Sequence, residues 1–228
     1  MKHAGKARRA AFKVILLSLI AVAVIWAIGL LILFMGLSLV VLTPGLLGIW
    51  ALFSLFTLYF FRDPNPRVPA GANLVVSPAH ARVDVIDTCV EPEFMGGECQ
   101  RISMFLSVID VHVQCAPVTG RVVYFKYTPG EYLSALKAES AQLNENALIG
   151  LEAAEPPGEK VGVRLIAGVI ARRIVPWVRE NDAVTRGERI SLIQFGSRVD
   201  VYLPRRARIQ VKLGDKVKGG ETVIAAFD

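Results

Sequence analysis

Few residues of this chain are suited to chemistry. There are only three histidines, His3, His80 and His112, and His3 lies in a basic tail. A Ser-His-Asp hydrolase would have to use His80 or His112, but the chain has no GxSxG nucleophile elbow. It also lacks a phosphate-binding loop, a GxGxxG turn and an HExxH motif. These absences argue against a nucleotide-dependent enzyme and a zinc protease.

The three cysteines are Cys89, Cys99 and Cys115. They are too few and too irregularly spaced for a disulfide framework or a zinc site, so we expect no bound metal. An odd number of cysteines also favours a reducing compartment.

The N-terminal quarter has the composition of a membrane anchor. No charged residue or histidine occurs between Lys13 and Arg62, and a single span needs only about 20 residues. We therefore predict two apolar helices, Val14–Met35 and Leu46–Phe61. The stretch is too long for a secretory signal. Because Pro44 interrupts the pattern, the second helix either crosses the bilayer or enters it and returns.

The charge distribution predicts orientation and excludes one partner. The first 13 residues carry five basic side chains and no acid, whereas the rest carries 21 basic and 20 acidic side chains. The positive-inside rule therefore places both ends of a helical hairpin in the cytoplasm. A nearly neutral remainder argues against binding to nucleic acid. The expected organisation is a basic tail (1–13), a membrane anchor (14–61) and a domain (62–228) on the cytoplasmic side of the cell membrane.

The domain after the anchor is expected to be mainly β. Short β-prone runs separated by turn residues predict nine strands: Leu74–Val76, Arg82–Ile86, Arg101–Phe105, Gly120–Tyr127, Val161–Ile166, Arg189–Ile193, Arg198–Tyr202, Arg208–Lys212 and Thr222–Ala226. One helix is predicted over Gly168–Val175, where apolar residues fall at helical intervals, and a polar loop over Ser134–Asn146.

Three segments, at 128–133, 180–188 and 213–221, share a pattern that suits tight hairpin turns. Each places an acidic residue beside a β-branched or apolar residue, with a glycine or alanine a few positions away. The last resembles a turn of biotinyl and lipoyl carrier domains, although the lysine that those carriers modify has no counterpart. The expected architecture is a transmembrane helical hairpin followed by an all-β, sandwich-like domain with two related halves and few helices.

The predicted function depends on one segment near the C-terminus. The run Ile193–Pro204, which contains Gly196-Ser197, resembles the processing site of the short, membrane-attached phosphatidylserine decarboxylases of prokaryotes. Other segments match that family in the same order, namely Phe60–Asn65, Ile102–Ser107, Asp110–Val113 and Ala116–Gly120. The resemblance runs from Phe60 to the C-terminus.

The resemblance implies a self-processing enzyme with a built-in cofactor. The Ser197 hydroxyl would attack the Gly196 carbonyl, and the ester formed would break by β-elimination. Residue 197 would become a covalent pyruvoyl group, and a large chain (1–196) would stay bound to a small chain (197–228) as a heterodimer. The pyruvoyl ketone would form a Schiff base with phosphatidylserine and accept electrons as CO2 leaves, giving phosphatidylethanolamine. Catalytic residues implied in this way are Ser197 and, for acid–base work, His112.

The chain departs from the family at one informative place. The family reads Ser-Pro-Ala-Asp-Gly where this chain has Ser-Pro-Ala-His-Ala at 77–81. His80 thus replaces an aspartate that is implicated in self-cleavage, and our hypothesis is that His80 deprotonates Ser197. Arginines at 172, 173, 205, 206 and 208 form small basic clusters that would attract anionic lipid.

Two alternatives stay open at this point. The same chemistry would suit an archaeal ether-linked serine phospholipid, because the headgroup is identical. A degenerate relative would bind lipid without splitting.

Overall fold

The computed structural model describes residues 5–33, 39–131, 144–168, 173–194 and 197–227. Contacts divide the chain into two units, one spanning Gly5–Asp63 and the other beginning at Pro64. The first unit is helical and the second is almost entirely β. This division agrees with the change in composition at Arg62.

The helical unit contains α1 (Lys6–Leu33) and α2 (Leu39–Phe60). Both α1 and the Leu42–Phe60 part of α2 are long and apolar enough to cross a membrane. The first helix begins eight residues before the predicted Val14, because the alanine, lysine and arginine residues of the basic tail are good helix formers. Pro44 lies inside α2, near its N-terminal end.

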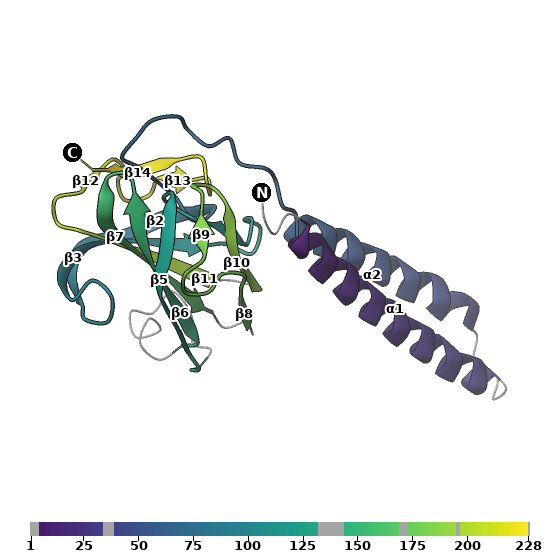
Figure 1. The fold of residues 1–228 in the computed structure, drawn as a ribbon. Coiled ribbons are helices and arrows are strands. Elements are labelled where there is room, and N and C mark those ends of the chain that lie inside the picture. The colour runs from purple at the N-terminus through teal and green to yellow at the C-terminus, as the bar shows by residue number, and fades with distance from the viewer. Residues whose placement is uncertain (1–4, 34–38, 132–143, 169–172, 195–196, 228) are drawn as a thin grey trace. The chain divides into compact units, whose positions relative to one another are not determined.

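The two helices lie side by side (Figure 1). The Trp50 indole of α2 donates a hydrogen bond to the Ser18 hydroxyl of α1 over 3.1 Å, and that hydroxyl donates to the Ile15 carbonyl over 2.8 Å. Polar side chains in apolar helices commonly satisfy one another in this way. The contact fixes one level at which α1 and α2 meet.

The second unit is mainly β, as predicted, and its strands are all antiparallel to their neighbours. They are β1 (Leu74–Val76), β2 (Ala81–Glu91), β3 (Gly97–Leu106), β4 (Val113–Cys115), β5 (Gly120–Thr128), β6 (Asn146–Ala154), β7 (Pro157–Ala167), β8 (Arg173–Pro176), β9 (Ala183–Val184), β10 (Arg189–Gln194), β11 (Ser197–Leu203), β12 (Arg208–Ile209), β13 (Lys216–Val217) and β14 (Val223–Ala226).

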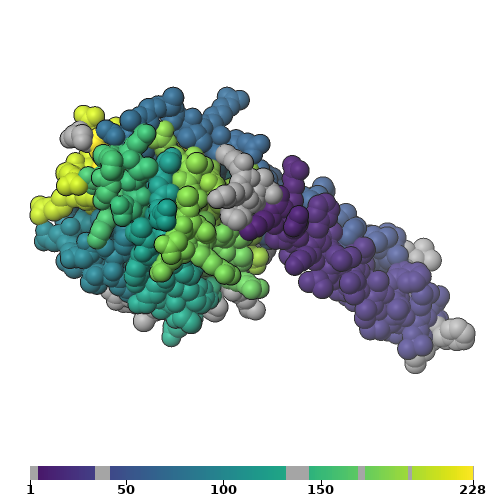
Figure 2. Space-filling model, in the orientation of Figure 1, coloured from purple at the N-terminus to yellow at the C-terminus, as the bar shows by residue number. Residues whose placement is uncertain are grey.

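These strands form three sheets. The largest has eight strands in the order β13-β2-β3-β11-β7-β6-β5-β9, and the two smaller sheets have the orders β1-β14-β12 and β4-β10-β8. A single apolar core takes side chains from all three, for example Val75 of β1, Ile190 of β10 and Val201 of β11. On the visible face of this unit, segments that are distant in the sequence lie next to one another (Figure 2). The two related halves stay a prediction.

Each of the nine predicted strands overlaps an observed strand, but two predictions need correction. The helix expected over Gly168–Val175 is wrong at its C-terminal end, because Arg173–Pro176 forms β8, which pairs with β10; residues 169–172 lie outside the described residues. The strand β6 was not predicted, and Asn146, expected at the end of a polar loop, begins it. The rest of that loop lies mainly outside the described residues.

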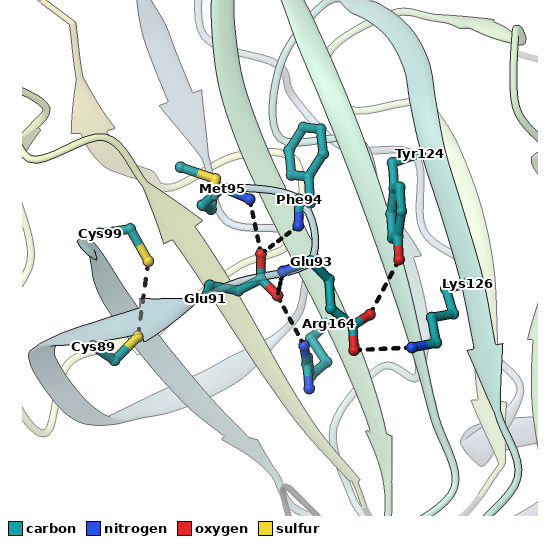
Figure 3. Close-up of polar contacts among 9 residues, drawn as sticks. All are labelled: Cys89, Glu91, Glu93, Phe94, Met95, Cys99, Tyr124, Lys126 and Arg164. Atoms are coloured by element: carbon teal, nitrogen blue, oxygen red, sulfur yellow. Dashed lines mark hydrogen bonds and ion pairs between the residues drawn. The ribbon is translucent and has the colours of Figure 1, made fainter. Parts of the chain in front are cut away.

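The turn between β2 and β3 is folded back over the main sheet by Glu91 (Figure 3). The buried Glu91 carboxylate accepts hydrogen bonds from the backbone N–H groups of Phe94 and Met95, each over 2.8 Å, and lies 3.2 Å from the Arg164 guanidinium. The Phe94 ring occupies space that a side chain on Gly150 would need, since a Cβ there would lie 2.5 Å from the ring. The glycine therefore makes room for this covering aromatic ring.

The segment that enters the β unit, residues 64–73, is bound by two arginines. The Arg186 guanidinium donates to the backbone carbonyls of Pro69 (2.9 Å), Gly71 (2.8 Å) and Leu74 (3.1 Å). The fully buried Arg189, at the start of β10, donates to the Asn65 side-chain oxygen over 2.9 Å. Asn65, the last residue of the Phe60–Asn65 motif, is thereby bound to the strand that leads toward residue 197.

Candidate active site

Ser197 is the first residue of β11, a strand inside the main sheet. It pairs with Leu106 of β3 on one side and with Ala167 of β7 on the other. Because side chains alternate along a strand, Ser197 points to the same side as Val199 and Val201, which is the core side. Its side chain is fully buried.

The Ser197 hydroxyl is a buried polar group without a hydrogen-bond partner among the described residues. An unsatisfied buried hydroxyl costs about 1–3 kcal/mol, so such groups are rare and ask for an explanation. Gly196, the other half of the expected cleavage site, lies outside the described residues. Ser197 is one of several buried polar side chains that hydrogen bonding within the described residues leaves unsatisfied.

The chain changes sheets immediately before Ser197. The preceding strand β10 belongs to the β4-β10-β8 sheet, whereas β11 belongs to the eight-stranded sheet. The junction between the two strands includes Gly196. The described residues on either side of this junction, Gln194 and Ser197, both take part in strand pairing.

His112 lies between β3 and β4 and is almost fully buried. Its Nδ1 lies 2.9 Å from the backbone carbonyl oxygen of Asp110. Because a carbonyl oxygen only accepts hydrogen bonds, this contact places a proton on Nδ1, and Nε2 of the neutral ring is the atom that can accept one. The orientation suits a proton acceptor.

The backbone of His112 is attached to the strand that leads to Ser197. Its carbonyl accepts hydrogen bonds from Ile193 N of β10 over 3.1 Å and from the Gln114 amide over 2.7 Å. The Ser191 hydroxyl of β10 in turn donates to Gln114 Oε1 over 2.8 Å. This network fixes His112 against β10.

A short turn connects His112 to the strand opposite Ser197. Leu106, the register partner of Ser197, ends β3, and the turn Ser107–Asp110 follows it. The Asp110 carboxylate accepts a hydrogen bond from Ser107 N over 2.8 Å, and Asp110 N donates to the Ser107 carbonyl over 2.9 Å. The fold thus brings His112 and Ser197 to the same end of β3 and β11, although no hydrogen bond joins His112 to the Ser197 hydroxyl in the described part of the chain.

His80 is half-buried and lines a cavity of about 550 Å³ at this end of the sheet. The lining residues are His80, Ala81, Arg82, Phe105, Ser107, Ile109, Asp110, Lys216, Val217 and Lys218. A Cβ on Gly219 would lie 3.2 Å from His80 Cδ2, so this glycine lets the backbone approach the ring. The structure brings His80 to the turn that carries Asp110, but no hydrogen bond joins His80 to the Ser197 hydroxyl among the described residues.

A charged cluster beside Ser197 was not predicted as part of the site. Arg198 is nearly buried and contacts the carboxylates of Asp84 and Asp200, each at 3.2 Å. Burial raises the pKa of the Asp200 carboxyl, while the nearby Arg198 and Arg101 charges oppose that shift. The alternation of Arg198 and Asp200 on one face of a strand is the sequence signal that could have revealed this pair.

Two arginines of the basic clusters proposed from the sequence form ion pairs. Arg205 lies 2.8 Å from Glu98, and Arg206 forms an ion pair with Glu159. Arg172 lies outside the described residues. Arg173 and Arg208 are exposed.

Comparison with known proteins identifies the family. A family model described as phosphatidylserine decarboxylase matches residues 53–225. The chain is 44% identical to a protein of Desulfotalea psychrophila over 77% of this chain and 81% of that protein. It is also 44% identical to a protein of Azorhizobium caulinodans over 92% of this chain and 86% of that protein. Both are named phosphatidylserine decarboxylase proenzyme.

The fold and the comparisons together define a mainly β decarboxylase with an apolar helical N-terminal unit. The chain belongs to the phosphatidylserine decarboxylase family. The resemblance stated from the sequence and the expectation of an enzyme are thereby confirmed.

Proposed function

We propose that this chain is a membrane-attached proenzyme that splits itself between Gly196 and Ser197 and then converts phosphatidylserine into phosphatidylethanolamine and CO2. The observation that carries the proposal is the buried Ser197 hydroxyl without a hydrogen-bond partner in the described residues. It lies at the position where the resemblance to the family predicts self-cleavage.

The splitting step uses only this chain's atoms and water. The Ser197 hydroxyl attacks the Gly196 carbonyl carbon, the C–N bond between the two residues breaks, and an ester joins them instead. Elimination across Cα–Cβ of residue 197 releases the Gly196 carboxylate and leaves a dehydroalanine. Addition of water and loss of ammonia then give a pyruvoyl group at the N-terminus of residues 197–228.

The environment of residue 197 fits this group, because the conversion replaces a buried hydroxymethyl side chain that has no hydrogen-bond partner in the described residues by a methyl group. The pyruvoyl ketone supplies an electron sink for loss of the carboxylate. The surrounding strands exclude water from residue 197, because both of its register partners, Leu106 and Ala167, are fully buried.

Two histidines are proposed for proton transfer. His80 takes the proton of the Ser197 hydroxyl, directly or through water, in the role that an aspartate fills elsewhere in the family. His112, with its proton on Nδ1, offers Nε2 as the acid–base atom during processing and decarboxylation. The two products of the cut stay together as a heterodimer, and the β unit lies on the cytoplasmic side because both flanks of the anchor are basic.

Intact-mass analysis of the purified protein tests the proposal. The wild-type chain should give two fragments, residues 1–196 and 197–228, with the short one lighter by one ammonia than its serine form. The Ser197→Ala variant should give one full-length mass and release no CO2 from phosphatidylserine. A single full-length mass for the wild-type chain would support a lipid-binding relative that does not split.

The histidine roles are separated by comparing splitting with decarboxylation. His80→Ala should slow the appearance of the two fragments, and splitting at the normal rate would eliminate the proposed role of His80. His112→Ala should lower CO2 release by about 10²–10⁴-fold even in molecules that have split. Normal turnover in this variant would remove His112 from the catalytic set.

A further inference from the structure

A cationic pair faces the cavity that contains His80. Lys216 of β13 pairs directly with Arg82 of β2, and both line this cavity. Residues directly opposite each other in an antiparallel pair lie on the same face of the sheet, and like charges in that arrangement are destabilising. The fold therefore keeps two positive side chains together against their mutual repulsion.

Neither cation is neutralised by the protein. In the part of the chain that the structure describes, no carboxylate lies within 4.0 Å of the Arg82 guanidinium or the Lys216 ammonium group. The Arg82 guanidinium donates to the Gly214 carbonyl over 3.1 Å, which limits its direction without compensating its charge. Both side chains are exposed, so an anion that enters the cavity can reach them.

The other charged groups of the cavity are already engaged. Lys218 lies 3.9 Å from the Glu221 carboxylate. The Asp110 carboxylate also lines the cavity and accepts a hydrogen bond from Ser107 N, a bond that holds the turn after β3 without compensating the charge. Among the described residues of this cavity, Arg82 and Lys216 are therefore the lysine and arginine side chains without a carboxylate partner.

The register places this pair near the proposed reaction centre, on the face of the sheet opposite to the Ser197 side chain. Arg82 pairs with Phe105 of β3, and Phe105 pairs with Arg198 of β11, the residue after Ser197. Two strand spacings, about 10 Å, separate the Arg82 and Arg198 backbones. An arginine side chain and a serine headgroup together can cover that distance.

The rim of the cavity is apolar on one side. Ile109 lines the cavity and is 62% exposed. A ligand that has an amine and a carboxylate at one end, a phosphodiester in the middle and an apolar part beyond it fits this order of groups. A free inorganic anion would use the cations but would gain nothing from Ile109.

We propose that Arg82 and Lys216 form the subsite that binds the phosphodiester of the lipid headgroup, so that they determine specificity for phosphoserine lipids over free serine. The proposal rests on the proposed function, because it places the amine of the same headgroup at residue 197. Neither residue takes part in bond breaking. Their loss should therefore weaken substrate binding without slowing the chemical step.

The test compares two lysines that differ in position but not in charge. Lys216→Gln removes a cation of the pair, whereas Lys212→Gln removes one from the preceding turn, which does not line the cavity. With phosphatidylserine in nonionic detergent micelles, Lys216→Gln should raise KM about tenfold or more, the loss of one charge-assisted hydrogen bond, at unchanged kcat and unchanged splitting. Lys212→Gln should leave KM at the wild-type value, and Lys216→Arg should restore most of the affinity.

A binding measurement keeps this proposal separate from the proposed function. Glycerophosphoserine is titrated into the Ser197→Ala chain with and without the added Lys216→Gln change, since neither protein needs to react. Weaker binding in the double variant supports the subsite even if the wild-type chain were found not to decarboxylate. Equal binding by the two proteins, including no binding by either, would overturn it.

Two kinetic outcomes would also contradict the proposal. An equal rise of KM in Lys216→Gln and Lys212→Gln would show a general attraction of the surface for anionic lipid instead of a subsite. A fall in kcat at unchanged KM would place Lys216 in the chemistry and would equally refute the proposal.

Discussion

Replacing Leu203 by alanine should loosen the hold of residues 197–228 on the rest of the chain. Leu203 is the last residue of β11, is fully buried in the core and pairs with Gln100 of β3. After the proposed cut, nothing covalent joins this segment to residues 1–196. Its retention then depends on strand pairing and on buried side chains such as Leu203.

The size of the effect follows from the packing. Fully burying Val199, Val201 and Leu203 contributes about 5–9 kcal/mol in all, which is a large part of the roughly 8 kcal/mol that micromolar association requires. Truncating a buried leucine to alanine costs about 2–5 kcal/mol, because the transfer free energy is lost and a cavity remains. This corresponds to association weakened about 30- to 4,000-fold.

Leu213 provides the matched control within the same segment. It is 62% exposed, so Leu213→Ala should change stability by less than about 0.5 kcal/mol. The split protein is incubated in increasing urea, and size-exclusion chromatography in detergent then reports how much of the short chain still elutes with the long one. The Ser197→Ala chain, which is expected to stay unsplit, should show the same ranking in its unfolding midpoints.

Two outcomes would refute this reasoning. Equal urea midpoints for Leu203→Ala and Leu213→Ala would show that β11 does not hold the segment through its core face. Loss of the short chain from the wild-type protein without denaturant would show that the buried strand does not hold the two chains together.

Three further predictions concern the β unit. Gly150→Ala should cost about 1–3 kcal/mol by overpacking against Phe94, and an unchanged melting temperature would contradict the covering role of that ring. Burial raises the pKa of the Cys99 thiol to about 12, so iodoacetamide at pH 8 should modify Cys99 only after unfolding; rapid labelling of the native protein would count against this. Burial also raises the pKa of the Asp200 carboxyl above its ordinary value of 3.8, so its contribution to stability is largest below that pH and falls as the pH rises through the folded-state pKa. In denaturant titrations, the unfolding free energy of Asp200→Asn should therefore increase relative to that of the wild type as the pH rises. A difference in unfolding free energy that does not change with pH would refute the predicted direction.

The missed strand β6 shows where sequence patterns stop being informative. Residues 147–151 read Ala-Leu-Ile-Gly-Leu, an apolar run without alternation. The run arises because β6 is covered on both faces: Ile149 faces the main core, while Leu148 packs in the cluster that contains Phe94. A glycine at position 150 weakens the strand signal further. The covering ring comes from a turn more than fifty residues earlier, so no local window could have revealed it.

The incorrect helix has a different cause. The apolar spacing of residues 168–175 is compatible with helical periodicity, but Arg173–Pro176 finds hydrogen-bond partners on β10. It is an edge strand of its sheet, so a proline at its end is tolerated. Pairing with a strand some fifteen residues later outweighed local propensity. By contrast, the two apolar N-terminal helices follow from local composition, and their prediction needed no knowledge of distant contacts.

The position of the two histidines could not be derived from residue types. Both were identified as candidates, yet only the fold distinguishes their surroundings, and Asp110 connects the two environments. Its backbone carbonyl contacts His112 Nδ1 in the buried interior, while the residue itself lines the cavity with His80. The replacement of the family's aspartate by His80 therefore puts a second imidazole on the solvent-accessible side of the same turn. That arrangement gives the proposed division of labour a physical basis: a proton removed from Ser197 during splitting can leave through the cavity, whereas His112 stays within the interior for the reaction with the lipid.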